Sequence, residues 1–121
     1  MLEPAWARSA PTNQGLTAVP RRPPFTVYYP DYADDAFVWD PPKSLATLDD
    51  RGLSFEVAKI AFRRRLLRRR DTRKDYGEPR YQVLGECYGT VVHIVFTPRN
   101  RQCRIISVRK ANAAEIEIYY A

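Results

Sequence analysis

The sequence predicts a single α+β domain, built from an antiparallel sheet with helices on one face and a short helix at its C-terminal end. Three observations lead to this fold class. Two helix-compatible segments lie between residues 41 and 62, four β-rich segments follow between residues 63 and 108, and only short turns separate these strands. A chain of 121 residues is long enough to bury one core.

The first 36 residues have the composition of an N-terminal extension rather than of a domain. They contain six of the ten prolines, and such a segment favours extended, poorly ordered backbone. We therefore expect residues 1–36 to be dispensable for folding and the domain to span residues 37–121. Residues 25–29 (FTVYY) are the exception, since this patch could dock as an edge strand on its own domain or on a neighbour.

The domain is expected to begin with a short strand at residues 37–40, followed by two helices. Asp40 is suited to cap the first helix, Pro41 to occupy its first position and Gly52 to end it. Ser54 is the expected cap of the second helix. These two helices are predicted to cover one face of the sheet.

Residues 63–70 (RRRLLRRR) contain six arginines in eight positions and have two interpretations. The run could be a ridge that binds RNA phosphates, with Arg68 and Arg70 among its contacts. It could instead be a charged edge strand, protected from aggregation, in which Leu66 and Leu67 reach the core.

Three further strands are expected at residues 80–86, 90–97 and 103–108. The last two flank the turn at residues 98–101 and form a hairpin. A short helix capped by Asn112 should follow at residues 113–120.

Alternation along the last strand sorts its side chains between two faces. If Ile106 and Val108 pack under the helices, then Ser107 and Arg109 stand on the exposed face. Arg104 shares the parity of Ile106, so only a β-bulge would bring it to that exposed face.

The positive charge is concentrated in the predicted domain. Residues 1–36 hold three arginines against four acidic residues, whereas residues 37–121 hold 17 lysines and arginines against 10 acidic residues, a net charge of +7. Such a domain favours a polyanionic partner, either nucleic acid or an acidic protein.

Cysteine and histidine usage offers no ligand spacing for a metal site, and we expect no cofactor. Cys87 and Cys103 fall in different strands and are expected to be buried thiols, as in a reducing cytoplasm. His93 lies in mid-strand, where a hydrogen-bonded core or sheet-face imidazole is favoured over a general base. No signal peptide and no run of ~20 apolar residues is found, so a cytoplasmic protein is expected.

Cleavage of RNA is a reaction that such a basic, metal-free chain can support, because the ribose 2′-OH is a built-in nucleophile. The enzyme must move two protons and stabilise charge on phosphorus. Arginine suits the second task. Candidates for proton transfer are Glu78, Glu115, Tyr119 and Tyr120. For any one arginine, a structural salt bridge is an equally valid interpretation.

Four segments resemble, in order and spacing, the motifs of the BrnT toxin family. They are residues 37–43 (FVWDPPK), 52–56 (GLSFE), 75–81 (DYGEPRY) and 104–111 (RIISVRKA). Glu115 and Tyr119 also fall where the last helix of that family carries Glu and Tyr. The resemblance extends over residues 37–121.

The resemblance implies a RelE-like fold and a bacterial type II toxin that cleaves RNA. It also implies neutralisation by a BrnA-like antitoxin, a ribbon-helix-helix protein. The catalytic candidates carried over are Arg80, Arg104, Ser107, Arg109, Glu115 and Tyr119, with Glu78 beside them. The expected RNA contacts are Lys43, Arg68, Arg70 and Lys110.

One departure from the family bears on activity. The first helix of the family commonly ends in Lys-His-Gly, and Asp50-Arg51-Gly52 stands there in this chain. If that histidine transfers a proton, this protein needs another base. The alternative function is a non-catalytic module of the same fold that only binds RNA or its antitoxin.

Overall fold

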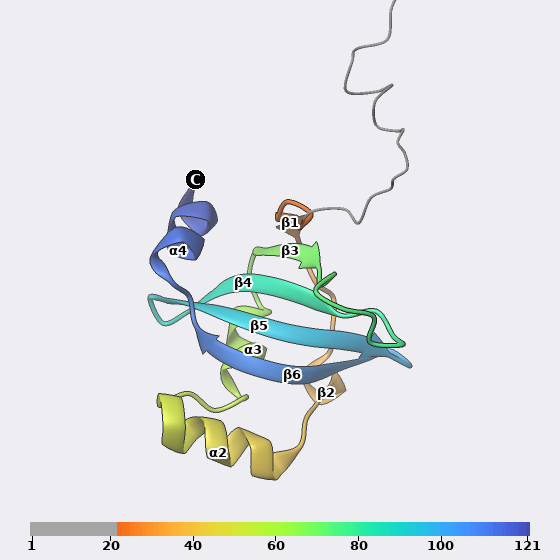
Figure 1. Ribbon diagram of the computed structural model, residues 1–121. Coiled ribbons are helices and arrows are strands. Elements are labelled where there is room, and N and C mark those ends of the chain that lie inside the picture. Colours follow the sequence, from red (N-terminus) through yellow and green to blue (C-terminus); the bar gives the residue numbers. More distant parts are fainter. Residues whose placement is uncertain (1–21) are drawn as a thin grey trace, which may run out of the picture.

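The computed structural model describes residues 22–121, which form a six-stranded mixed sheet with helices against it (Figure 1). The strand order is β1-β3-β4-β5-β6-β2, and every pair is antiparallel except β2 with β6. The elements are β1 (Thr26–Tyr28), a 3-10 turn (Asp34–Ala36), β2 (Phe37–Val38), α2 (Pro41–Arg51), α3 (Val57–Ala61), β3 (Leu66–Arg70), β4 (Tyr81–Cys87), β5 (Thr90–Arg99), β6 (Gln102–Lys110) and α4 (Ala113–Tyr120). The predicted α+β class is confirmed.

The sheet begins inside the segment that was expected to be an extension. Residues 26–28 form β1 and pair with β3, so residues 25–29 do supply an edge strand, and β3 is not itself at the edge. The pairing is stabilised by the aromatic ring of Tyr28, which packs on the core and lies 4.1 Å from the guanidinium of Arg68. The expectation for residues 1–21 lies outside the described residues.

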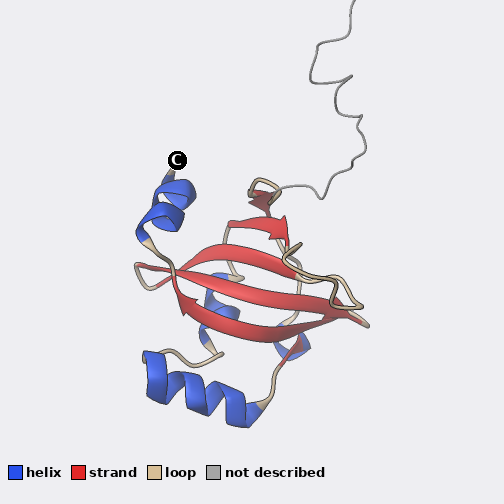
Figure 2. Ribbon diagram, viewed as in Figure 1, coloured by secondary structure: helices blue, strands red, loops and turns tan. Residues whose placement is uncertain are grey.

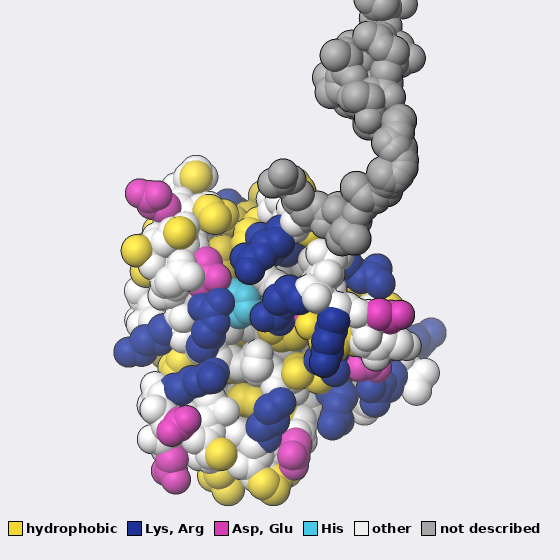
Figure 3. Space-filling view, in the orientation of Figure 1, with side chains coloured by type: hydrophobic (Ala, Val, Ile, Leu, Met, Phe, Trp, Pro, Cys, Tyr) yellow, Lys and Arg dark blue, Asp and Glu magenta, His cyan; other side chains and the backbone are white. Residues whose placement is uncertain are grey.

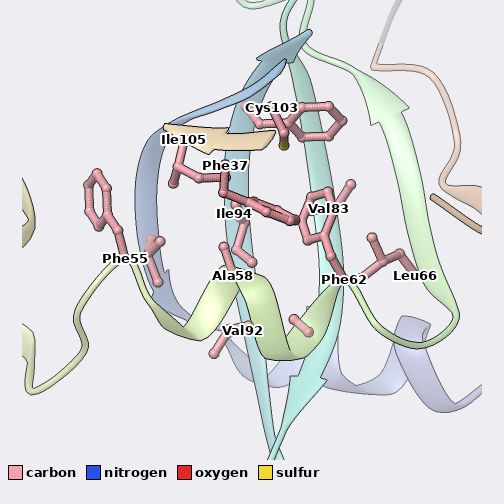
Figure 4. Packing of buried hydrophobic residues seen from close by; sticks show 13 residues of the cluster. Phe37, Phe55, Ala58, Phe62, Leu66, Val83, Val92, Ile94, Cys103 and Ile105 are labelled. Atoms are coloured by element: carbon pink, nitrogen blue, oxygen red, sulfur yellow. The ribbon is translucent and has the colours of Figure 1, made fainter. Parts of the chain in front are cut away.

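The main core lies between the sheet and α3 (Figure 4). Phe62 stands at its centre, with ring centres 5.3 Å from those of both Phe37 and Phe96. Gly85 allows α3 to approach β4 closely, because a Cβ there would lie 3.1 Å from the Cβ of Ala61. This face of the sheet is therefore closed to solvent.

A β-bulge in the β5–β6 hairpin decides which side chains reach the other face. Val95 pairs with Ser107, but the next residue of β5, Phe96, pairs with Ile105, so Ile106 is left without a partner. Ile105 and Val108 are the buried pair, and the expectation that Ile106 lies under the helices is wrong. The bulge shifts the alternation by one residue.

The N-terminal helices are tied to each other and to the sheet by polar contacts. Gly52 ends α2 with a left-handed φ of 74°, as predicted. The Oγ of buried Ser44 accepts from the Phe55 N–H at 2.9 Å, and Arg51 Nη1 donates to the Val108 carbonyl at 2.9 Å. The second helix, α3, starts at Val57 rather than directly after Ser54, which was the expected cap, and it is only 5 residues long.

The C-terminal helix α4 lies on the opposite side of the sheet from α3, at one end (Figure 2). Tyr119 packs there with Leu67, Leu84 and Val91. Of the two N-terminal helices that were expected to cover one face, α3 contributes to the main core on the other side of the sheet, whereas α2 contributes no residue to it. Between α4 and the far end of the strands, this face has no helix over it, and we call it the open face.

Candidate active site on the open face

His93 occupies the middle of the open face, surrounded by basic side chains (Figure 3). In register, His93 pairs with Leu84 on β4 and with Arg109 on β6, and Gln82, two residues before Leu84 on β4, is its diagonal neighbour. Gln82 Oε1 accepts a hydrogen bond from Arg69 Nε at 3.0 Å and lies 3.4 Å from His93 Nε2. The strands thus set a polar row of Arg69, Gln82, His93 and Arg109 across the sheet.

The hydrogen bonds of this row indicate which nitrogen of the His93 imidazole carries the proton. Because Gln82 Oε1 is an acceptor, His93 Nε2 carries the proton and Nδ1 carries a lone pair. Nδ1 is buried without a hydrogen-bond partner in residues 22–121. Burial, reinforced by the charge of Arg109, lowers the pKa of His93 to about 4, so the imidazole is neutral at pH 7.

Arg109 is held at the end of this row by Glu115. Its guanidinium makes two hydrogen bonds to the carboxylate, at 2.8 and 2.9 Å. The same carboxylate accepts from the Asn112 N–H at 2.9 Å, and Asn112 Oδ1 accepts from the Glu115 N–H, which closes a capping box at the start of α4. The Arg109 hydrogen bonds and then the Asn112 N–H lower the pKa of Glu115 to about 2.

A second group of charges lies at the end of the strands farthest from α4. Glu78 accepts from Arg99 at 2.7 Å, and its other oxygen lies 3.8 Å from Arg80 Nε. The Arg80 guanidinium also stacks on the ring of Tyr76, 4.2 Å from its centre. Arg104 adds a positive charge near Glu78.

The bulge brings three of the predicted catalytic residues to the same face. Arg104 pairs with Thr97, Ser107 with Val95 and Arg109 with His93, and these three residues of β5 alternate on the open side. The condition stated for Arg104, a bulge in the strand, is therefore met. Arg80 and Arg104 lie toward one end of the face, and Ser107, Arg109 and Glu115 toward the other.

Tyr119 and the predicted RNA contacts lie elsewhere. The Tyr119 hydroxyl donates to the Arg65 carbonyl at 3.2 Å and is held in the second apolar cluster. By register, Arg68, Arg70 and Lys110 belong to the face that α3 covers, and Lys43 is exposed in the first turn of α2. Arg68 is flanked there by the rings of Tyr28 and Tyr81.

Sequence reasoning missed Arg69, Asp71 and Arg73. Alternation within the arginine run would have separated Arg69 from Arg68 and Arg70, once the register of β3 was known. Asp71, which is 3 % exposed, accepts two hydrogen bonds from Arg73, at 2.8 and 2.7 Å. The interpretation of His93 as a hydrogen-bonded sheet-face residue is confirmed, but its charged surroundings were not foreseen.

The cysteines, the possible metal ligands and the helices of the described residues also bear on the expectations from the sequence. Cys87 and Cys103 are buried free thiols, as predicted, and burial raises the pKa of both. Within residues 22–121, no group of three or more His, Cys, Asp or Glu side chains could hold a metal ion. No helix in that part of the chain is long and apolar enough to cross a membrane.

Comparison with known proteins agrees with the motifs. A family model described as the ribonuclease toxin BrnT of type II toxin–antitoxin systems matches residues 39–115. The matched range includes the polar row and the bulge, and it ends on Glu115. None of the curated proteins matches the chain. With well over half of its residues in that match, the chain belongs to the BrnT family of ribonuclease toxins.

Proposed function

We propose that this protein is a metal-independent endoribonuclease that cleaves RNA by attack of the ribose 2′-OH on the adjacent phosphate. One observation carries the proposal: Arg109 and Arg69 flank a buried histidine whose Nδ1 has no hydrogen-bond partner in residues 22–121, on the face of the sheet that no helix covers. Two fixed cations beside a proton acceptor are what this reaction requires.

Arginines supply the charge stabilisation in this mechanism. Arg109, with Arg69 opposite, holds the scissile phosphate as charge grows on its oxygens, and the Ser107 hydroxyl donates a further hydrogen bond. Arg80 and Arg104 hold the next phosphate along the face. Glu115 is a positioning residue, since it fixes the guanidinium of Arg109.

Basic side chains outside the open face bind the rest of the RNA strand in this proposal. Lys43, Arg68, Arg70 and Lys110 lie outside the open face, so in this proposal they contact the RNA only where it runs past the edge of the sheet. Tyr119 does not contact the phosphate in this proposal. Its hydroxyl donates to the Arg65 carbonyl and so helps to hold α4 in place.

In this proposal His93 accepts the proton of the 2′-OH as the 2′-oxygen bonds to phosphorus, and the 5′-oxygen takes up a proton from water as its own bond to phosphorus breaks. The imidazole is only 4 % exposed and its Nδ1 is buried, so in this proposal the neighbouring side chains move aside to admit one bridging water that carries the proton. After burial, the charges that lower the pKa of His93 include those of Arg109 and Arg69, which bind the scissile phosphate in this proposal. A bound phosphate cancels part of their field and makes the imidazole a stronger base.

The biological role proposed is that of a cytoplasmic growth inhibitor held by its antitoxin. The family is one of type II systems, so an antitoxin partner is implied. We propose a BrnA-like ribbon-helix-helix protein whose acidic segment covers the arginines of the open face.

A second candidate function is a non-catalytic module that binds RNA or antitoxin. The observation in its favour is Arg51, which stands in place of the helix-end histidine of the family and is bonded to the Val108 carbonyl. A residue so engaged transfers no proton. Expression without antitoxin distinguishes the two, since only a nuclease arrests growth and degrades message.

The mechanism is tested with one RNA, its 2′-deoxy counterpart and three protein variants. Cleavage should continue in EDTA, leave a 2′,3′-cyclic phosphate and stop when the cleaved position is 2′-deoxy. Arg109→Ala should lower the rate ~100- to 1,000-fold and His93→Phe ~100-fold or more. Arg64→Ala, an exposed arginine outside the open face, is the matched control. Cleavage of the deoxy substrate, or strict dependence on magnesium, would overturn the mechanism.

A further inference from the structure

A pocket of about 550 Å³ lies in the loop that joins β3 to β4, next to the open face. In Figure 1 this loop is the green segment at the right-hand end of the strands. The side chains that matter for its chemistry are Arg70, Arg73, Lys74, Asp75 and Tyr76. Its volume is within the range of about 300–1,000 Å³ that small-molecule sites occupy.

The walls of this pocket are held in place by the loop itself. Asp71 accepts hydrogen bonds from the Arg73 side chain and backbone, and from the Tyr76 hydroxyl at 3.3 Å. Asp75 Oδ1 accepts from the Gly77 N–H at 2.9 Å, where Gly77 has a left-handed φ of 74°. The pocket therefore needs little reorganisation to receive a ligand.

Two side chains of the pocket also act on residues of the proposed active site. Arg73 lines it and is also one of the cations that lower the pKa of His93. Tyr76 lines it and carries the Arg80 guanidinium on its ring. An RNA strand with a phosphate on the polar row thus has a neighbouring nucleotide within reach of the pocket.

The charges of the lining favour a base over a phosphate. Three cations face three carboxylates, because Glu78 and Asp71 also line the pocket. Those two carboxylates are already bonded to Arg99 and Arg73. Asp75 keeps one oxygen without a hydrogen bond in residues 22–121, and within the same range Arg70 and Lys74 make no ion pair.

We propose that this pocket binds the base of the nucleotide next to the scissile phosphate, and that the base is guanine. Guanine offers O6 and N7 as acceptors to Arg70 or Lys74, and its amino group as a donor to Asp75. Adenine lacks the carbonyl oxygen and uracil lacks the amino group. The proposal rests on the ribonuclease function and adds sequence preference to it.

The test uses four RNAs that differ only in the base next to the cleaved bond. Single-turnover rates are measured for each, and a second set with a 2′-deoxy cleavage position reports binding by fluorescence anisotropy. Wild type should prefer guanine by roughly tenfold or more, since one well-placed polar pair discriminates by about 5- to 150-fold. The preference should appear in both sets.

Asp75→Asn is the informative variant, because the amide oxygen can still accept from Gly77 while the charge is lost. This variant should reduce the guanine preference to about threefold or less, because the guanine amino group loses a charged hydrogen-bond acceptor. Asp49→Asn, an exposed aspartate on α2, removes the same charge and should leave the preference unchanged.

The outcomes separate this proposal from the one on which it rests. Equal rates and affinities for all four bases, or a guanine preference that survives Asp75→Asn, would overturn the pocket and leave the nuclease standing. Guanine preference in binding without any cleavage would support the pocket and reject the nuclease. Failure to bind any of the RNAs would reject both.

Discussion

Replacing His93 by phenylalanine should remove one step from the acid unfolding curve of this protein. The imidazole is buried, and the folded state holds its pKa near 4, against 6.5 for an ordinary histidine. As pH falls from 6.5 to 4, the unfolded chain binds a proton that the folded chain does not accept. Stability is therefore complete above pH 6.5 and is lost as pH falls through this window.

The size of the effect follows from the shift in pKa. At about 1.4 kcal/mol per pH unit, a shift from 6.5 to about 4 corresponds to about 3 kcal/mol of unfolding free energy. Three arginines, at positions 69, 73 and 109, oppose protonation, and Glu115 favours it. Phenylalanine keeps an aromatic ring at this position and takes up no proton.

Urea unfolding at a series of pH values between 7 and 4.5 measures this difference. Trp39, which packs edge-on against Phe55, provides the fluorescence signal. Wild type should lose roughly 2–3 kcal/mol over the range, and His93→Phe should lose clearly less. Glu115 and Asp71 have folded pKa values near 2, and the unfolded chain protonates them around their ordinary values of 4.5 and 3.8, so most of their effect on stability falls below pH 4.5. An equal loss in both proteins would refute the assignment of a buried neutral imidazole.

Three other outcomes are expected. Gly85→Ala should cost about 1–3 kcal/mol in thermal unfolding, because the new methyl meets the side chains of Ala61 and Leu66; an unchanged melting temperature would mean that α3 is loosely packed. Removal of residues 1–36 should lower the melting temperature, because it strips β1 from β3; a shift under a few degrees would restore the view of a dispensable extension. The antitoxin complex should weaken as salt rises, given the charge of +7 on residues 37–121; affinity independent of salt would argue against an electrostatic interface.

The sequence was sufficient for the class of fold and for most elements, because hydrophobic alternation and turn residues are local signals. Pro41, Gly52 and Asn112 mark helix boundaries that the structure confirms. The bulge at Ile106 was not predictable, since it depends on how two strands pair. A single extra residue moved Arg104 to the open face and left Ile106 out of the buried core.

The position of β1 also depends on contacts distant in sequence. Residues 26–28 pair with β3, where the guanidinium of Arg68 lies over the ring of Tyr28. The number of prolines in residues 1–36 gives no information on whether part of this segment pairs with β3. For the candidate site, the residue types were visible in the sequence, whereas the grouping of Arg69, Gln82 and His93 required the register of three strands.

The capping box at the start of α4 has a consequence for the timing of activity. One carboxylate, that of Glu115, both begins the helix and holds Arg109. When the first turn of α4 frays, the Glu115 amide loses its bond to Asn112 and the guanidinium loses its anchor in the same event. The exchange rate of the Glu115 amide hydrogen with solvent deuterium therefore reports how often Arg109 is released. Any partner that loosens α4 would release Arg109 from Glu115 without contacting the open face.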